Sequence, residues 1–177
     1  SGTLLTNGEP DGPAAWVELL RLAQEKGIPQ VVAVRGQRVE SGDGVVLEVL
    51  NPAARTEGSS DDRSIVLRVT YGEVALLLAA DARGGAEEDL LASAQPLSSA
   101  VLKAADGGDR NGTGHQFLHA VNPSLVIVSV SDSYRDRHPA PAVLERIAQL
   151  GRPVMRTDER GSIDLTTDGA NLWVDTE

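Results

Sequence analysis

The stretch from 64 to 81 constrains the fold of this chain more than any other. Residues 64–70 alternate apolar and polar side chains, which predicts a strand with one covered face. After a turn at Tyr71-Gly72, residues 73–80 become continuously apolar, which is typical of a strand covered on both faces. Such a strand needs packed layers on either side of its sheet, so the chain must build a layered sheet protein.

The remaining segments supply those layers. Helices are predicted over 13–26, 86–94, 115–121 and 141–150, and further strands over 30–34, 45–50, 100–104, 125–130 and 153–156. Loops are predicted over 55–61, 106–114 and 131–137, and a terminal hairpin over 161–166 and 171–175. The strand at 30–34 is expected to be buried. Because only 3% of the residues are aromatic, the core must consist of Val, Leu, Ile and Ala. We therefore expect one α/β (α+β) domain over 1–177, a mixed sheet with flanking helices.

Charge and composition exclude several functions. The 26 acidic residues outnumber the 16 basic ones, and a net charge of -10 opposes strong unaided binding to nucleic acid. The chain has no cysteine, so disulfides and thiolate metal sites are excluded. No apolar run reaches the roughly 18 residues of a membrane span, and no signal peptide is visible. If the parent protein is membrane-bound, its spans are expected to lie outside this chain.

Two aspartates follow predicted strands, where hydrolases often keep metal ligands. Asp81 ends the apolar strand, and Asp106 begins a glycine-rich loop. Oxygen ligands of this kind favour Mg²⁺ or Mn²⁺ over zinc. The alternative for Asp81 is a cap on backbone amides, and the alternative for Asp106 is simple preference of Asp and Gly for loops.

Histidines and one lysine offer further candidates. His115 and His119 are four residues apart on a predicted helix and could share a face, but the Gln at 116 cannot replace a catalytic glutamate. His138 either lines a cleft or caps a loop. Lys103, at a strand end, either contacts a phosphate or is solvated or paired with a carboxylate.

Several short motifs occur in a characteristic order. LLTNGEPDGPAAWVELLRLAQEKGIP precedes VVLEVLNP, and Asp62-Arg63-Ser64 precedes the Tyr-Gly turn and the strand ending at Asp81. The strand that ends at Lys103 precedes the glycine-rich loop, and His138-Pro139 precedes the helix that starts at 141. In this order the chain resembles the metallo-β-lactamase superfamily, and within it the extracytoplasmic C-terminal domain of ComEC-type DNA-uptake proteins.

The resemblance implies a metallo-β-lactamase-like αββα sandwich, of which this chain is the C-terminal portion. It aligns Asp81 with a carboxylate that bridges two metals, and His138, a catalytic candidate together with Lys103, with the histidine of the family's Gly-His-Pro loop. Three features depart from the family pattern. The His-x-His-x-Asp-His motif is absent, Asp106-Gly107-Gly108-Asp109 replaces His-His-Gly-Ser, and Ala80 replaces the glycine before the aspartate. Asp106 could substitute for the missing imidazole.

The resemblance implies a domain on the outer side of the cell membrane, with metal-dependent hydrolysis of DNA during natural transformation. No activity and no cofactor are expected in this chain by itself, whereas the intact domain could hold Zn²⁺, Mn²⁺ or Mg²⁺. The parent's partner would be DNA, and an exposed sheet face or edge would favour a homo-oligomer. The alternatives are a degenerate scaffold domain of the uptake channel and a soluble hydrolase of a small ester.

Overall fold

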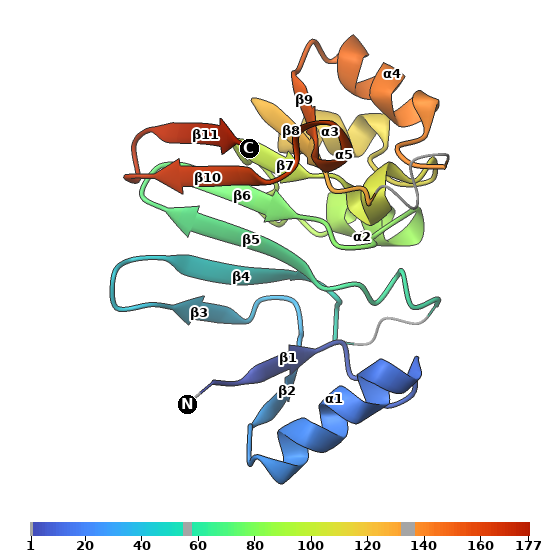
Figure 1. Ribbon diagram of the computed structural model, residues 1–177, viewed down its shortest axis with the longest axis vertical. Helices are drawn as coiled ribbons and strands as arrows, with labels where there is room; N and C mark the ends of the chain where they lie inside the picture. Colours follow the sequence, from blue (N-terminus) through green and yellow to red (C-terminus); the bar gives the residue numbers. More distant parts are fainter. Residues whose placement is uncertain (1, 55–57, 132–136) are drawn as a thin grey trace.

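A seven-stranded mixed sheet forms the centre of the computed structural model, which describes residues 2–54, 58–131 and 137–177 (Figure 1). In spatial order its strands are β3 (Arg38–Glu40), β4 (Val46–Asn51), β5 (Val66–Tyr71), β6 (Val74–Leu78), β7 (Val101–Lys103), β8 (Leu125–Val128) and β9 (Val154–Arg156). Strands β3 to β6 form an antiparallel meander, and β6 to β9 run parallel. The predicted mixed α/β architecture with flanking helices is therefore confirmed.

Three helices cover one face of the parallel half. They are α2 (Gly85–Ala92), α3 (His115–Val121) and α4 (Pro141–Gln149), and they connect successive parallel strands. Alternate residues of the strands, such as Leu77 and Leu102, pack with Leu90, Phe117 and Ile147 in the main core. All five side chains are 0 or 1% exposed. The apolar run over 73–80 thus has the covering layer that its pattern requires.

A hairpin covers part of the opposite face. It consists of β10 (Ile163–Thr167) and β11 (Leu172–Thr176), paired antiparallel as predicted. Its apolar side chains pack with Val101, Leu125 and Ile127 in a second, smaller cluster. Gly72, with φ +58°, lets the hairpin turn approach, because a side chain at this position would collide with the backbone of Gly169.

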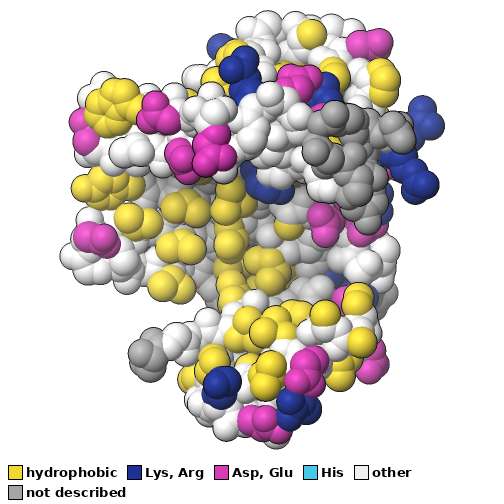
Figure 2. Space-filling view, viewed as in Figure 1, with side chains coloured by type: hydrophobic (Ala, Val, Ile, Leu, Met, Phe, Trp, Pro, Cys, Tyr) yellow, Lys and Arg dark blue, Asp and Glu magenta, His cyan; other side chains and the backbone are white. Residues whose placement is uncertain are grey.

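The N-terminal unit is much less covered. It consists of β1 (Leu4–Thr6), α1 (Ala14–Glu25) and β2 (Gln30–Val32), with the two strands paired parallel to each other. All three residues of β2 are exposed, so the expectation of a buried strand here was wrong. Figure 2 shows apolar side chains gathered over this unit and over neighbouring strands of the sheet. The sequence pattern correctly marked these side chains as apolar, but no second layer among the described residues buries them.

Some elements escaped prediction because they are short. They are β1, β3, the 3-10 helix η1 (Ala105–Gly108) and α5 (Thr157–Arg160). The predicted loops over 55–61 and 131–137 lie partly outside the described residues. The seven-stranded sheet agrees with an αββα sandwich in its helical and sheet layers, but the four-layer arrangement, like the assignment of 1–177 as one partial domain, stays a prediction. No helix among the described residues is long and apolar enough to cross a membrane.

Candidate functional site

Asp81 lies just beyond the end of β6, on the wall of a cleft of about 570 Å³. The preceding residue, Ala80, has φ +47°, a left-handed conformation that favours glycine. Strained backbone of this kind often occurs at functional sites. Asp81 is exposed and lines the cleft, as expected for a residue that follows the carboxyl end of a parallel strand.

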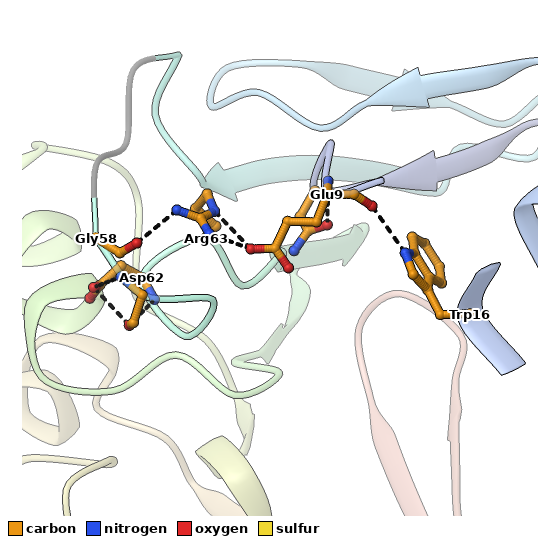
Figure 3. Close-up of polar contacts among 7 residues, drawn as sticks. Glu9, Trp16, Gly58, Asp62 and Arg63 are labelled. Carbon is orange, nitrogen blue, oxygen red and sulfur yellow. Dashed lines mark hydrogen bonds and ion pairs between the residues drawn. The ribbon is translucent and has the colours of Figure 1, made fainter. Parts of the chain in front are cut away.

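The N-terminal unit forms the opposite wall of this cleft, and a set of polar contacts fixes it (Figure 3). The indole Nε1 of Trp16 donates a hydrogen bond to the carbonyl oxygen of Glu9 at 3.0 Å. The carboxylate of Glu9 accepts a hydrogen bond from Arg63 Nε at 2.9 Å, and Arg63 Nη1 donates to the carbonyl of Gly58 at 2.7 Å. Arg63 therefore joins the N-terminal unit to the loop that precedes β5.

The Asp62-Arg63-Ser64 motif organises that loop. The side-chain nitrogen of Asn51 donates to the carbonyl oxygens of Asp62 and Ser64, both at 2.8 Å. The carboxylate of Asp62 accepts hydrogen bonds from Ser59 N–H at 2.8 Å and Ser59 Oγ at 2.9 Å, which lower the pKa of Asp62. The motif thus shapes one wall of the cleft, a role that its sequence alone did not reveal.

Asp106 and His138 share a second cavity, of about 320 Å³. Asp106 has φ +44° within η1, and its N–H donates to the carbonyl of Ala80 at 2.8 Å. The two glycines that follow allow the His138 loop to approach: a side chain at Gly108 would lie 2.7 Å from Pro139 Cβ. His138 Nδ1 is buried and has no hydrogen-bond partner in the described structure. Three predicted residues, Asp81, Asp106 and His138, are therefore neighbours.

The pKa of Asp106 reflects this crowding. Burial raises it, and the charges of Asp81 and Asp109 add to the effect, while Arg83 and His138 act in the opposite direction. For Asp109, burial is outweighed by hydrogen bonds from Asn111 N–H and Arg83, so its pKa is lowered. The region is an acidic cluster with one strong internal counter-charge.

That counter-charge, Arg83, was not identified from the sequence. Its Nη1 lies 3.0 Å from Asp106 Oδ2 and 3.3 Å from Asp109 Oδ1, and its Nη2 contacts the carboxylate of Asp61. The hydrogen bond to Asp61 and the neighbouring carboxylates raise the pKa of Arg83 despite burial. The separation of Asp61, Arg83 and Asp109 along the chain hid this contact, because only the loop packing brings them together.

The described residues do not by themselves form a metal cage. Within 2–54, 58–131 and 137–177, no three His, Asp or Glu side chains gather closely enough to hold an ion. The Asp106 carboxylate, the predicted substitute for an imidazole, is instead paired with Arg83. Metal ligation by Asp81 and Asp106 in a larger assembly stays a prediction.

The other candidates lie apart from this cluster. Lys103, at the end of β7, is on the strand face opposite Leu102 and lines neither cavity. His115 and His119 are both exposed on α3, whereas Phe117 and Leu118 are buried. The structure thus joins neither the lysine nor the histidine pair to Asp81.

Two competence proteins match most of this chain. It is 27% identical over 146 residues to ComE operon protein 3 of Bacillus subtilis (strain 168), covering 82% of this chain and 19% of that protein. It is 34% identical over 124 residues to Competence protein ComA of Neisseria gonorrhoeae, covering 70% of this chain and 18% of that protein. No family model matches.

Over most of its length the chain is therefore a distant homologue of competence proteins of the ComEC and ComA type. It spans less than a fifth of the length of these relatives.

Proposed function

We propose that this chain is an extracytoplasmic domain of a membrane-bound DNA-uptake protein of natural transformation, and that it contributes a structural element without cutting DNA by itself. The relatedness to two competence proteins, which reaches across 82% and 70% of the chain, carries the first part of the proposal. The hydrogen bonds that tie Glu9 to Trp16 and Arg63 support the second part, because these groups at the cleft are paired with one another rather than free to act as ligands.

The electrostatics agree with an indirect role in handling DNA. With a net charge of -10, the chain repels a phosphate backbone, so DNA would be held by other parts of the parent protein. A domain of this kind can shape or close the channel mouth without a basic groove of its own. The pairing of Asp106 with Arg83 also occupies an oxygen of this carboxylate that a metal ion would need as a ligand.

The proposal is tested in the organism that carries the gene, with the full-length parent protein. Deleting the segment that encodes residues 1–177 is expected to lower transformation frequency strongly, whereas Asp81→Ala should leave it close to the wild-type value. Membrane fractions probed with an antibody to another part of the parent protein provide the control for expression of both variants. Unchanged transformation after the deletion would reject a role in uptake.

A second candidate, metal-dependent hydrolysis of DNA by the intact protein, is favoured by one observation. Asp106 and His138 line one cavity, and the Asp106 N–H donates to the carbonyl oxygen of Ala80, the residue that precedes Asp81. Hydrolysis would require further ligands from outside the described residues. A purified full-length protein that degrades DNA with Mn²⁺, and loses this activity with Asp81→Ala, would favour the second candidate over the first.

A further inference from the structure

We propose that the guanidinium of Arg83 is the cation that holds the aspartate cluster together, so that these carboxylates do not fit the metal ion that the family resemblance implies. The proposal does not rest on a role in DNA uptake, because it depends only on contacts within this chain. It accounts for the mismatch between the family resemblance, which implies a metal, and the described residues, which form no metal cage.

Three carboxylates from two separate loops meet at this one side chain. Asp61 belongs to the loop before β5, while Asp106 and Asp109 belong to the glycine-rich loop after β7. Arg83 itself follows β6. The guanidinium therefore joins three of the loops that link the strands of the sheet. Its planar fork of N–H donors can pair with several carboxylates at once.

The aliphatic part of Arg83 is also positioned by packing. A side chain at Gly112 would lie 3.4 Å from Arg83 Cγ and 3.1 Å from Ala105 Cβ, so glycine leaves space for the arginine stem. The neighbouring Gly84 N–H donates to the carbonyl of Asn111 at 3.3 Å. A backbone contact to the glycine-rich loop, as well as charge, therefore holds Arg83 in place.

Burial distinguishes this cluster from an ordinary surface ion pair. The side-chain exposures in the cluster are 28% for Arg83, 31% for Asp61, 36% for Asp106 and 18% for Asp109. By contrast, Arg21 pairs with Glu18 and Glu25 along the exposed surface of α1, and these three side chains are 50 to 56% exposed. Exposed pairs contribute little to stability, whereas carboxylates left without their cation in a partly buried cluster repel one another.

Thermal unfolding of four proteins tests the proposal: the wild type, Arg83→Ala, Arg83→Lys and the matched control Arg21→Ala. Each is measured with EDTA and with millimolar MnCl₂. With EDTA, Arg83→Ala should lower Tm by about 3–6 °C, and Arg21→Ala by less than about 2 °C. Mn²⁺ should leave the Tm of the wild type unchanged, because an ion that bound the folded cluster would raise it. Arg83→Lys, which keeps the charge but not the planar fork, should lower Tm by less than Arg83→Ala does and should likewise be unaffected by Mn²⁺.

Each other outcome would overturn the proposal. Saturable stabilisation of the wild type by Mn²⁺ would mean that the cluster still binds metal beside Arg83. A wild-type Tm for Arg83→Ala would mean that the ion pairs are incidental. Equal losses of Tm for Arg83→Lys and Arg83→Ala would mean that the positive charge does not hold the cluster, and would reduce Arg83 to a loop contact. If Arg83→Ala fails to fold, titration of the wild type and of Arg83→Lys with Mn²⁺, followed by isothermal calorimetry, still decides the question.

Discussion

The N-terminal unit and the helix-covered half of the sheet are both rich in apolar residues, yet they differ sharply in burial. Leu77 and Leu102, in the central strands, are 0% exposed, whereas Val31 and Val32 of β2 are 41% and 50% exposed. Helix α1 buries only Ala23. The difference comes from neighbouring layers, since α2, α3 and α4 cover the central strands and no comparable described element covers β2.

The parallel pairing of β1 and β2 makes this difference in burial informative. Parallel strands are found in sheets whose two faces are both covered. The pair β1 and β2 is parallel but two-stranded, and the exposed apolar residues of α1 and β2 lie beside it. We conclude that an apolar pattern specifies the type of an element, whereas burial depends on what packs against it.

The largest expected effect on stability comes from replacing a leucine by alanine in the core, compared with the same replacement in the N-terminal unit. Leu102→Ala should lower the free energy of unfolding by about 3 kcal/mol, because it leaves a cavity in a core without exposed neighbours. Leu19→Ala in α1, where the side chain is 45% exposed, should cost less than about 1 kcal/mol. Urea unfolding measures both. Equal losses would mean that the N-terminal unit is as well packed as the core.

The second-largest effect on stability is expected at a buried acidic residue in α2. Glu87 is 6% exposed, and its carboxylate accepts hydrogen bonds from the N–H groups of Thr113 and Gly114. Glu87→Gln supplies one oxygen for two donors and should lower stability by about 1–2 kcal/mol at neutral pH. Glu88→Gln, at an exposed neighbouring position, is the matched control and should change stability little.

The pKa of Glu87 also predicts how the stability of the fold depends on pH. Burial raises the pKa of Glu87 above its usual value, although the two N–H donors and Arg146 partly offset this. The folded state therefore binds more protons, and stability should fall as pH rises from the unfolded pKa of Glu through the folded one. Glu87→Gln should remove this slope from unfolding curves measured between these values. A wild-type slope of opposite sign that the variant abolishes would contradict the assignment.

Backbone strain beside Asp81 predicts a smaller gain. Because Ala80 has φ +47°, Ala80→Gly should raise the free energy of unfolding by roughly 0.5–1 kcal/mol. The same substitution at Ala15, in the helix of the N-terminal unit, should lower it by a similar amount. Denaturant midpoints compare the two. A loss of stability for Ala80→Gly would show that the left-handed conformation is not strained.

The smallest effect on stability is expected at β2. Val31→Lys should change the free energy of unfolding by less than about 0.5 kcal/mol, because its side chain is already 41% exposed. If the exposed apolar surface drives self-association, as the sequence predicts, sedimentation at high concentration should show a dimer that this variant weakens. A wild-type chain that stays monomeric would reject the predicted homo-oligomer.

The fold was easier to predict than the site. The runs over 64–80 predicted β5 and β6 because their periodicity is long, and the terminal hairpin predicted over 161–166 and 171–175 corresponds to β10 and β11. Short elements such as β1 carry too few residues for a periodic signal. Asp81, Asp106 and His138 were identified as candidates, but Arg83 was not, because no local pattern links it to Asp61.

The sequence by itself determined which segments become strands and helices, because hydrophobic periodicity and turn residues act over a few neighbouring positions. It also determined the acidic balance and the absence of thiol chemistry. Only the tertiary structure decided which apolar segments are buried and which cation the aspartates meet. Both depend on contacts between loops and layers far apart in the chain, and the geometry of those contacts exists only once the sheet has formed.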